Sequence, residues 1–294
     1  MRSQATLSQP IRVHGTGLHS GRSVEVLLHP AGIYQGISFF RRDTATTIPA
    51  VAEEAGKLDY ATSLGAPGRD VGTVEHLLSA AAGLGLTNLV VEVDGPEMPI
   101  LDGSALPWVR ALQRAGVVHQ AARIPVWRPT RTLSLTGPGG KHIEIRPSQD
   151  LRVTYSIDFP SQVIGRQSIT LVVTPDVYLR HVAPARTFGF LADYEQMKSK
   201  GLARGASADN CIVVGDDRVE NGDLRFPDEF VRHKVLDLLG DLALVGQPVA
   251  GHIVASRAGH ALHVQLAQAI REEAARSGML VPAGIDSSWA AAGR

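Results

Sequence analysis

The sequence predicts an α+β fold in two lobes, because each half of the chain begins with short strand-like runs and continues with helix-like runs. At 294 residues, with 44% hydrophobic and 20% charged residues, the chain is globular in composition and long enough for two domain cores. The second half repeats the order of the first half, namely strands, a helix, a strand and a helix. This order indicates a coarse duplication, although no sequence repeat is visible.

The first lobe opens with three short runs of β-type residues, separated by turns that contain Gly and Pro. These runs are residues 11–14, 23–28 and 36–40. A helix is predicted over 73–84, with Thr73 as its N-cap and with Gly83 and Gly85 marking its end. We expect the rest of the lobe to be a buried strand over 89–94, a loop over 98–104 and a helix over 105–115.

The second lobe follows residues 120–129, where Pro, Arg and small residues mix as in a linker. We therefore assign the first domain to residues 1–119 and the second domain to residues 130–294. The strand pattern resumes at residues 130–135, 142–147 and 151–157. The sequence then predicts helices over 191–200 and 227–244, a strand over 251–264 and a last helix over 265–276.

Charge and cysteine content exclude several classes of protein. Lys and Arg number 29 and Asp and Glu also number 29, so the chain lacks the basic excess of a nucleic-acid binder. A single cysteine, Cys211, cannot form an intrachain disulfide and fits a reducing compartment. Residues 1–13 contain no apolar signal-peptide core, and no apolar run approaches the length of a membrane span. We expect a cytoplasmic protein with no membrane span, whose partner is a small molecule or a protein.

The helix predicted over 227–244 carries a histidine and a carboxylate on one face. Because positions i and i+4 lie above one another on a helix, His233 and Asp237 point the same way. Imidazole and carboxylate suit zinc, which in catalytic sites commonly takes three protein ligands and leaves a fourth position open. The third candidate ligand is His76 on the earlier helix, where the neighbouring Glu75 supplies a proton acceptor for water. These two segments, far apart in the sequence, thus predict a single metal site.

Asp241 extends this polar stripe by one more turn, while the other side of the helix is apolar. The apolar residues are Val235, Leu236, Leu238, Leu239 and Leu242. A helix with this pattern packs its apolar side on a sheet, so we expect the polar stripe to face a cleft. The alternative is a solvated face with a His–Asp pair. The pair Glu75 and His76 has a similar alternative, a charge effect at a helix N-terminus, although its flanks are apolar.

Three further motifs invite a chemical interpretation. His260 follows a glycine near the start of a predicted strand, which suits a general acid or, alternatively, a hydrogen-bonded histidine in a turn. Residues 185–190 combine Thr187, a cation and two aromatic residues, which suits an oxyanion contact beside an apolar wall, or an ordinary packed turn. Residues 15–21 are rich in glycine, but a strand follows them instead of a helix, so we reject a dinucleotide-binding loop.

These motifs together resemble the family of zinc-dependent UDP-3-O-acyl-N-acetylglucosamine deacetylases, which commit the pathway to lipid A in Gram-negative bacteria. The motifs that carry the resemblance are residues 15–21 (GTGLHSG), 62–64 (TSL), 73–78 (TVEHLL), 99–104 (PILDGS), 185–189 (ARTFG), 232–234 (RHK) and 259–262 (GHAL). They follow the family's order over most of the chain, and their joint occurrence is specific. The resemblance implies two similar α+β domains, each a sheet layered with helices, with the active site between the helix layers.

The resemblance also implies a role for each polar residue of the site. His76, His233 and Asp237 would hold one zinc ion per chain, with iron(II) as an alternative because these ligands accept several divalent metals. Glu75 would be the general base and His260 the general acid of an amide hydrolysis. Three more residues would assist: Thr187 at the oxyanion, Lys234 beside the substrate, and Asp241 orienting or tuning His260.

In this family, an insert over about 188–214 lines a passage for the acyl chain of the substrate. The residues that the resemblance assigns to this passage are Phe188, Phe190, Leu191, Leu202, Ala203, Ser207 and Val213. The expected reaction releases acetate from UDP-3-O-acyl-N-acetylglucosamine and leaves a free amine. A zinc amidase for another amide and a non-catalytic sugar-nucleotide binding protein are the alternatives.

The chain departs from the family's pattern at two places. His263 stands where relatives more often have asparagine, next to the proposed general acid, and it could alter the hydrogen bonding of His260. The segment that contains Ala61 and Thr62 lacks the cysteine that some members carry there. Neither departure affects a proposed ligand.

Overall fold

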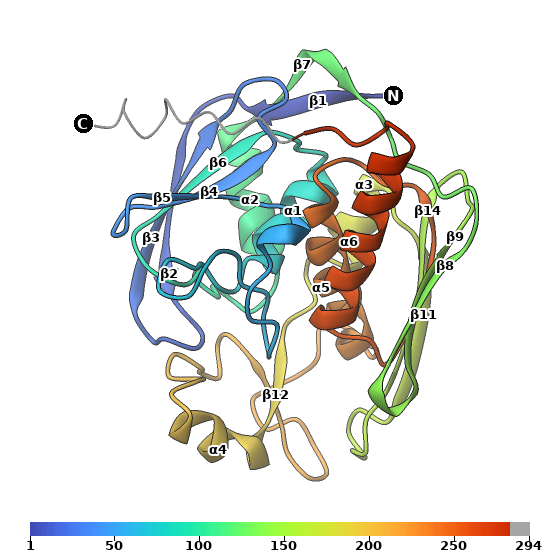
Figure 1. Cartoon of the computed structure of the whole chain (residues 1–294). Helices are drawn as coiled ribbons and strands as arrows, with labels where there is room; N and C mark the ends of the chain where they lie inside the picture. The colour runs from blue at the N-terminus through green and yellow to red at the C-terminus, as the bar shows by residue number, and fades with distance from the viewer. Residues whose placement is uncertain (283–294) are drawn as a thin grey trace.

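The computed structural model describes residues 1–282 of the chain. Two five-stranded sheets lie on the outside of the molecule, and two layers of helices fill the space between them (Figure 1). This arrangement confirms the predicted α+β class with two halves, each a sheet covered by helices. Among the described residues, no helix combines the length and the apolar character that a bilayer crossing requires.

The first half contains a sheet with the strand order β2-β3-β6-β4-β5. Its strands are β2 (Ile11–Thr16), β3 (Ser23–Pro30), β4 (Ile37–Arg41), β5 (Thr46–Pro49) and β6 (Leu89–Val93). Its helices are α1 (Glu75–Leu84) and α2 (Leu106–Ala115), with a short 3-10 turn at Ala52–Glu54. The predicted strands and helices of this half are therefore present, and β5 is an additional strand that the sequence pattern did not indicate.

The second half contains a sheet with the order β8-β9-β14-β10-β11. Its strands are β8 (Leu133–Gly137), β9 (Lys141–Arg146), β10 (Leu151–Asp158), β11 (Arg166–Val172) and β14 (Gly251–Ser256). Its helices are α3 (Pro175–His181), α5 (Glu229–Leu242) and α6 (His260–Arg276), with 3-10 turns at Pro138–Gly140 and Ala243–Val245. The sequence pattern missed β11 and α3. The predicted second domain extends to residue 294, of which 283–294 lie outside the described residues.

The two sheets have the same topology. In each sheet, an outer hairpin pairs antiparallel with the central strand, which is β6 in the first half and β14 in the second half. This central strand is the last of its sheet in the chain, and it forms a parallel pair with β4 in the first half and with β10 in the second half. The helices α1 and α5 each precede this central strand in the chain, and they pack against each other at the centre of the molecule. The repeated order of elements read from the sequence is therefore repeated in space.

Two small sheets lie outside this plan. β1 (Arg2–Leu7) pairs antiparallel with β7 (Val117–Ile124), so the segment predicted as a linker begins inside a strand. β12 (Phe188–Phe190) pairs parallel with β13 (Ile212–Val214). Between these two strands lie a 3-10 turn, Leu191–Asp193, and α4 (Tyr194–Ser199), which form a separate extension at the bottom of Figure 1.

Two predicted boundaries are wrong. Thr73 is not the N-cap of α1, because its backbone is left-handed (φ 57°) and its hydroxyl donates instead to Glu97 Oε1, 3.3 Å away. The strand predicted over 251–264 ends at Ser256, where Arg257 (φ 50°) turns the chain, and His260 is the first residue of α6. His260 thus lies at a helix N-terminus and not near a strand start.

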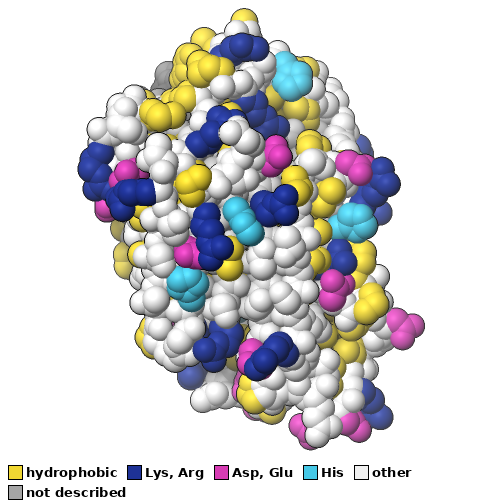
Figure 2. All heavy atoms as spheres, turned by 90° about the vertical axis from the view of Figure 1, so that its right-hand side faces the viewer, with side chains coloured by type: hydrophobic (Ala, Val, Ile, Leu, Met, Phe, Trp, Pro, Cys, Tyr) yellow, Lys and Arg dark blue, Asp and Glu magenta, His cyan; other side chains and the backbone are white. Residues whose placement is uncertain are grey.

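Figure 2 looks onto the outer face of the second sheet, where basic, acidic and histidine side chains are interspersed. Small hydroxyl residues pair across the strands there, for example Thr154 with Thr170 and Ser156 with Ser168, each pair at 2.9 Å. The inner face of the same sheet carries buried residues such as Ile253. One face of the sheet is thus polar and the other packs on α5 and α6, which leaves the helix layers as the place where a buried polar site can form.

Candidate metal centre and active site

Three metal-ligating side chains meet where the first turn of α1 lies against α5. His76 comes from α1, and His233 and Asp237 lie one turn apart on α5; each is 3% exposed. Asp237 Oδ1 lies 3.3 Å from His233 Nε2 and 3.9 Å from His76 Nε2. One ligand atom from each residue falls within 4.8 Å of the other two. The stripe predicted on this helix is therefore buried, and the solvated alternative is wrong.

The hydrogen bonding of these side chains fits a cation. Asp237 Oδ1 is buried and has no hydrogen-bond partner within residues 1–282, although a buried carboxylate oxygen without a partner is costly. The ring nitrogen Nδ1 of His233 lies 3.1 Å from the Ala185 carbonyl oxygen, so it must carry the proton, and Nε2 keeps its lone pair toward Asp237. A metal ion among these atoms would satisfy the unpartnered oxygen.

The charge states of the three residues suit the same conclusion. Burial lowers the pKa of His76 to about 3 and also lowers the pKa of His233, so both imidazoles are neutral and able to act as ligands. Burial alone would raise the pKa of Asp237, but its interactions with the neighbouring His233 and Lys234 outweigh burial and hold this pKa well below its usual range. Lys234 Nζ lies 2.7 Å from Asp237 Oδ2, which leaves Oδ1 as the free oxygen.

Glu75 lies beside this group at the start of α1 and is 3% exposed. Its Oε2 accepts a hydrogen bond from the backbone N–H of Thr62 at 3.0 Å. Burial raises the pKa of Glu75 to about 8. The nearby charge of Asp237 also raises this pKa, whereas the charge of His260 lowers it. A carboxyl group tuned close to neutral pH is well matched to proton transfer.

Asp241 joins two histidines on the other side of the site. Its Oδ2 lies 2.9 Å from His260 Nδ1 and 2.9 Å from His263 Nδ1, and its Oδ1 accepts the hydroxyl proton of Thr62 at 2.6 Å. Burial works to lower the pKa of His260, but Asp241 outweighs it and raises that pKa to about 9. These three residues also fall within metal-binding distance. Their atoms are already hydrogen-bonded to one another, unlike Asp237 Oδ1.

A family model described as UDP-3-O-acyl N-acetylglycosamine deacetylase matches residues 4–272. The chain belongs to this family. The UDP-3-O-acyl-N-acetylglucosamine deacetylase of Myxococcus xanthus is 46% identical over 274 residues, which cover 92% of this chain and 87% of that protein. The deacetylases of Nitratidesulfovibrio vulgaris and Thermosynechococcus vestitus are each 44% identical to this chain. Each alignment covers 92% of this chain, together with 89% of the first protein and 95% of the second. The resemblance read from the sequence motifs is confirmed.

Thr187 lies on a segment of this deacetylase-family chain that is held from both sides. Its N–H donates to the Gly103 carbonyl at 2.8 Å, and its carbonyl accepts from the N–H of Ile212 at 2.8 Å. Gly103 has φ 82°, and a Cβ at that position would overlap the Asn210 carbonyl, so a side chain does not fit. The motif over 99–104 thus helps to fix the segment whose Ala185 carbonyl bonds to His233.

The residues predicted to line an acyl passage lie at different depths. Phe188 packs edge-on against Phe230, with ring centroids 5.1 Å apart, and its ring lies 6.3 Å from that of His233. Leu191, by contrast, is 52% exposed. The others lie along the same extension: Phe190 at the end of β12, Leu202, Ala203 and Ser207 in the loop after α4, and Val213 in β13. The structure therefore places Phe188 beside His233 of the candidate metal triad and leaves Leu191 at the surface.

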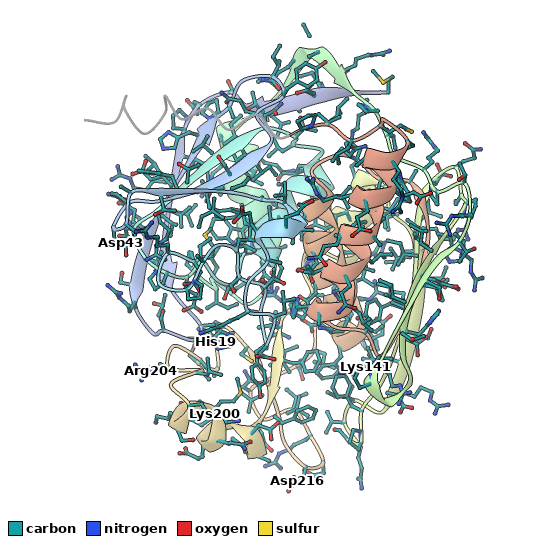
Figure 3. All side chains as sticks on the ribbon, in the orientation of Figure 1. His19, Asp43, Lys141, Lys200, Arg204 and Asp216 are labelled. Atoms are coloured by element: carbon teal, nitrogen blue, oxygen red, sulfur yellow. The ribbon has the colours of Figure 1, made fainter. Side chains whose placement is uncertain are left out.

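The glycine-rich segment over 15–21 covers the end of β2 and the turn that leads to β3, which agrees with the rejection of a dinucleotide loop. Glu97 holds this connection, because its two oxygens accept the N–H groups of His19 and Ser20 at 2.7 Å each. The extension between β12 and β13 contacts the same connection, because the backbone N–H of Arg204 donates to the His19 carbonyl at 3.2 Å. Figure 3 shows both residues at this contact. The motif therefore attaches the extension of the second half to the first half.

Sequence reasoning missed two polar residues of the site, Thr62 and Tyr155. Thr62 lies in a quoted motif but received no role, and Tyr155 reaches His263 Nε2 at 2.9 Å from β10. Both contacts join residues far apart in the chain, so no local sequence pattern predicts them. His263, which the sequence singled out as a departure, is fully buried and bonded to Asp241.

Proposed function

We propose that the protein hydrolyses the N-acetyl group of UDP-3-O-acyl-N-acetylglucosamine with the help of one zinc ion, releasing acetate and a free amine. The reaction would be the committed step of lipid A biosynthesis in the cytoplasm. Membership of the deacetylase family supports the substrate. The observation that carries the chemistry is the unpartnered Asp237 Oδ1, buried between two neutral imidazoles and flanked by Glu75 and His260.

His76, His233 and Asp237 would hold the metal through Nε2 of each histidine and Oδ1 of the aspartate. Zinc bound there would act as a Lewis acid that polarises the amide carbonyl and makes water a stronger nucleophile at neutral pH. Iron(II) is an alternative occupant, because imidazole and carboxylate ligands also accept it.

Glu75, in its ionised form, would take the proton from the attacking water. Its Oε2 is held by the N–H of Thr62, so Oε1 is the oxygen left to receive that proton. His260 would give a proton to the departing nitrogen. Its Nδ1 faces Asp241, so Nε2 is the atom that exchanges the proton, and a pKa of about 9 keeps the imidazole charged at neutral pH.

Lys234 and Thr187 would stabilise and position the substrate. Lys234 Nζ is held 2.7 Å from Asp237 Oδ2 and keeps further N–H donors for an oxygen of the substrate. Thr187 would donate to the developing oxyanion, and its fixed backbone would spare reorganisation at the moment of reaction. Asp241 would orient His260 from behind.

The extension over 188–214 would guide the acyl chain away from the metal. Phe188 lies next to His233 and would begin this passage, and Leu191 would end it at the surface. The remaining residues of the proposed passage are Phe190, Leu202, Ala203, Ser207 and Val213. An apolar lining suits a hydrocarbon chain because it removes that chain from water.

The test is release of acetate from UDP-3-O-acyl-N-acetylglucosamine by the purified protein. Turnover should vanish after chelation and return with one equivalent of zinc. His76→Ala should fail to regain turnover, whereas His119→Ala, at an exposed histidine of β7, serves as the matched control and should behave as wild type. Metal-loaded protein that binds the nucleotide sugar without releasing acetate, or that cleaves a peptide amide instead, would overturn the proposal.

A further inference from the structure

Thr62 touches both ends of the proposed proton-transfer machinery. It is 1% exposed, its backbone N–H donates to Glu75 Oε2 at 3.0 Å, and its hydroxyl donates to Asp241 Oδ1 at 2.6 Å. Glu75 belongs to α1 in the first half, whereas Asp241 belongs to α5 in the second half. One residue therefore connects the candidate base with the partner of the candidate acid.

A count of the protons fixes the directions of these hydrogen bonds. The Thr62 hydroxyl has one proton, which it gives to Asp241, so toward His260 Nδ1, 3.1 Å away, the hydroxyl can only accept. Asp241 Oδ2, 2.9 Å from the same nitrogen, can also only accept. Both neighbours require the hydrogen on Nδ1. The neutral ring therefore carries its lone pair on Nε2, which lies 3.9 Å from Asp237 Oδ2 on the metal side.

The first half holds Thr62 rigidly. Its carbonyl accepts the Val74 N–H at 3.3 Å, just before α1 begins. The residues that follow are tied on both sides, because Ser63 N–H donates to the Lys57 carbonyl at 3.0 Å and Leu64 exchanges two backbone hydrogen bonds of 2.9 Å with Val71. The Thr62 hydroxyl is thus a fixed point of the first half that reaches into the second half.

Asp241 depends on this hydroxyl for one of its two oxygens. Oδ2 receives two histidine N–H groups, His260 and His263, whereas Thr62 is the donor that residues 1–282 provide to Oδ1. Without it, a fully buried carboxylate oxygen would lose its partner, and the carboxylate could rotate away from His260.

We propose that Thr62 is a positioning residue, which fixes Nε2 of His260 as its proton-exchanging nitrogen and holds Glu75 at a set place relative to it. This inference rests on the proposed function. Thr62 does not reach the reacting atoms, so its effect passes through Asp241, His260 and Glu75 and concerns the rate of proton transfer more than the binding of substrate.

The test compares Thr62→Val, which keeps the shape and the backbone N–H but removes the hydroxyl, with Thr62→Ser, which keeps the hydroxyl. Thr62→Val should lower kcat about 10- to 100-fold, part of the 10²- to 10⁴-fold that a positioned acid or base provides, with KM and bound zinc within about twofold of wild type. Thr62→Ser should stay within about threefold in kcat. Thr136→Val, at an exposed threonine of β8, is the matched control and should leave kcat unchanged.

Two results would overturn the proposal: a Thr62→Val enzyme with wild-type kcat, or a Thr62→Ser enzyme as impaired as Thr62→Val. Nitrogen-15 shifts of the His260 ring, measured at a pH where the ring is neutral, give an independent readout that needs no turnover. Wild type should show the hydrogen on Nδ1, and a hydrogen on Nε2 would refute the inference. If wild type shows the expected shifts but releases no acetate, the proposed reaction fails while the geometry of Thr62 stands.

Discussion

Glu229→Gln is the substitution whose effect on stability follows most directly from the structure. Glu229 is fully buried at the start of α5, and its carboxylate accepts four hydrogen bonds. Three come from Arg186, through its backbone N–H at 3.0 Å, Nε at 2.9 Å and Nη2 at 3.1 Å, and one comes from the N–H of Arg225 at 2.6 Å. A glutamine keeps one acceptor oxygen and turns an NH₂ group toward these donors.

The cost of this change can be worked out from the contacts. Removing one partner of a buried ion pair costs about 3–5 kcal/mol, because the remaining charge stays buried. Arg186 keeps a hydrogen bond to the Asp223 carbonyl at 2.8 Å, and its side chain is 16% exposed, which places the cost near the lower end, at about 3 kcal/mol. For a chain of this size, each kcal/mol lowers Tm by about 2–4 °C, so Tm should fall by about 6–12 °C.

The assay is thermal unfolding of wild type and Glu229→Gln, followed by circular dichroism at neutral pH. Asp158→Asn is the matched control, because it removes an exposed partner of Arg166 at 3.1 Å and should cost about 0–1 kcal/mol. A Tm for Glu229→Gln within the range of this control would refute the reasoning from the buried ion pair.

Three further outcomes are expected. Glu75→Ala should lower turnover by about 10²- to 10⁴-fold while zinc content stays at the wild-type value, and near-normal turnover would contradict its role as base. Asp237→Ala should lose zinc during dialysis, because it removes the unpartnered Oδ1, so unchanged zinc content would speak against a ligand. Burial tends to raise the pKa of Glu229, but the hydrogen bonds and charge of Arg186 outweigh burial and hold this pKa below its ordinary 4.5. The stability that the Glu229–Arg186 pair contributes is therefore fully present above pH 4.5 and is lost as the pH falls through the lowered pKa. The Tm difference between wild type and Glu229→Gln should accordingly shrink in acid, and a constant difference would exclude this linkage.

Local patterns were enough to find the elements that bury an apolar stripe or face. The helix over 227–244 is an example, because Val235, Leu236 and Leu239 repeat with the helical period and α5 buries all of them. β11 escaped notice because it is an outermost strand whose residues alternate between exposed and half-buried, so few are strongly apolar. Thr73 misled because Ser and Thr favour N-caps, whereas here a tertiary contact with Glu97 took the hydroxyl.

The candidate site also contains residues that local spacing predicted and one residue that it could not predict. His233 and Asp237 share one helical face, so spacing alone proposed them, and Glu75 and His76 came from a second motif. Thr62 left no such signal, since its hydroxyl bonds to a residue 179 positions away in the sequence. A threonine with this role looks like any other threonine until the two halves are placed together.

The duplicated fold places the two proposed proton-transfer groups on different halves. α1 and α5 hold equivalent places in the two halves, and Gly240 lets them cross closely, because a Cβ at 240 would overlap the Glu75 carbonyl. The first half then supplies Glu75 and the second half supplies His260 at the start of α6. The hydrogen bond from Thr62 to Asp241 also crosses from one half to the other, so it adds to the helix contact in fixing how Glu75 and His260 lie relative to each other.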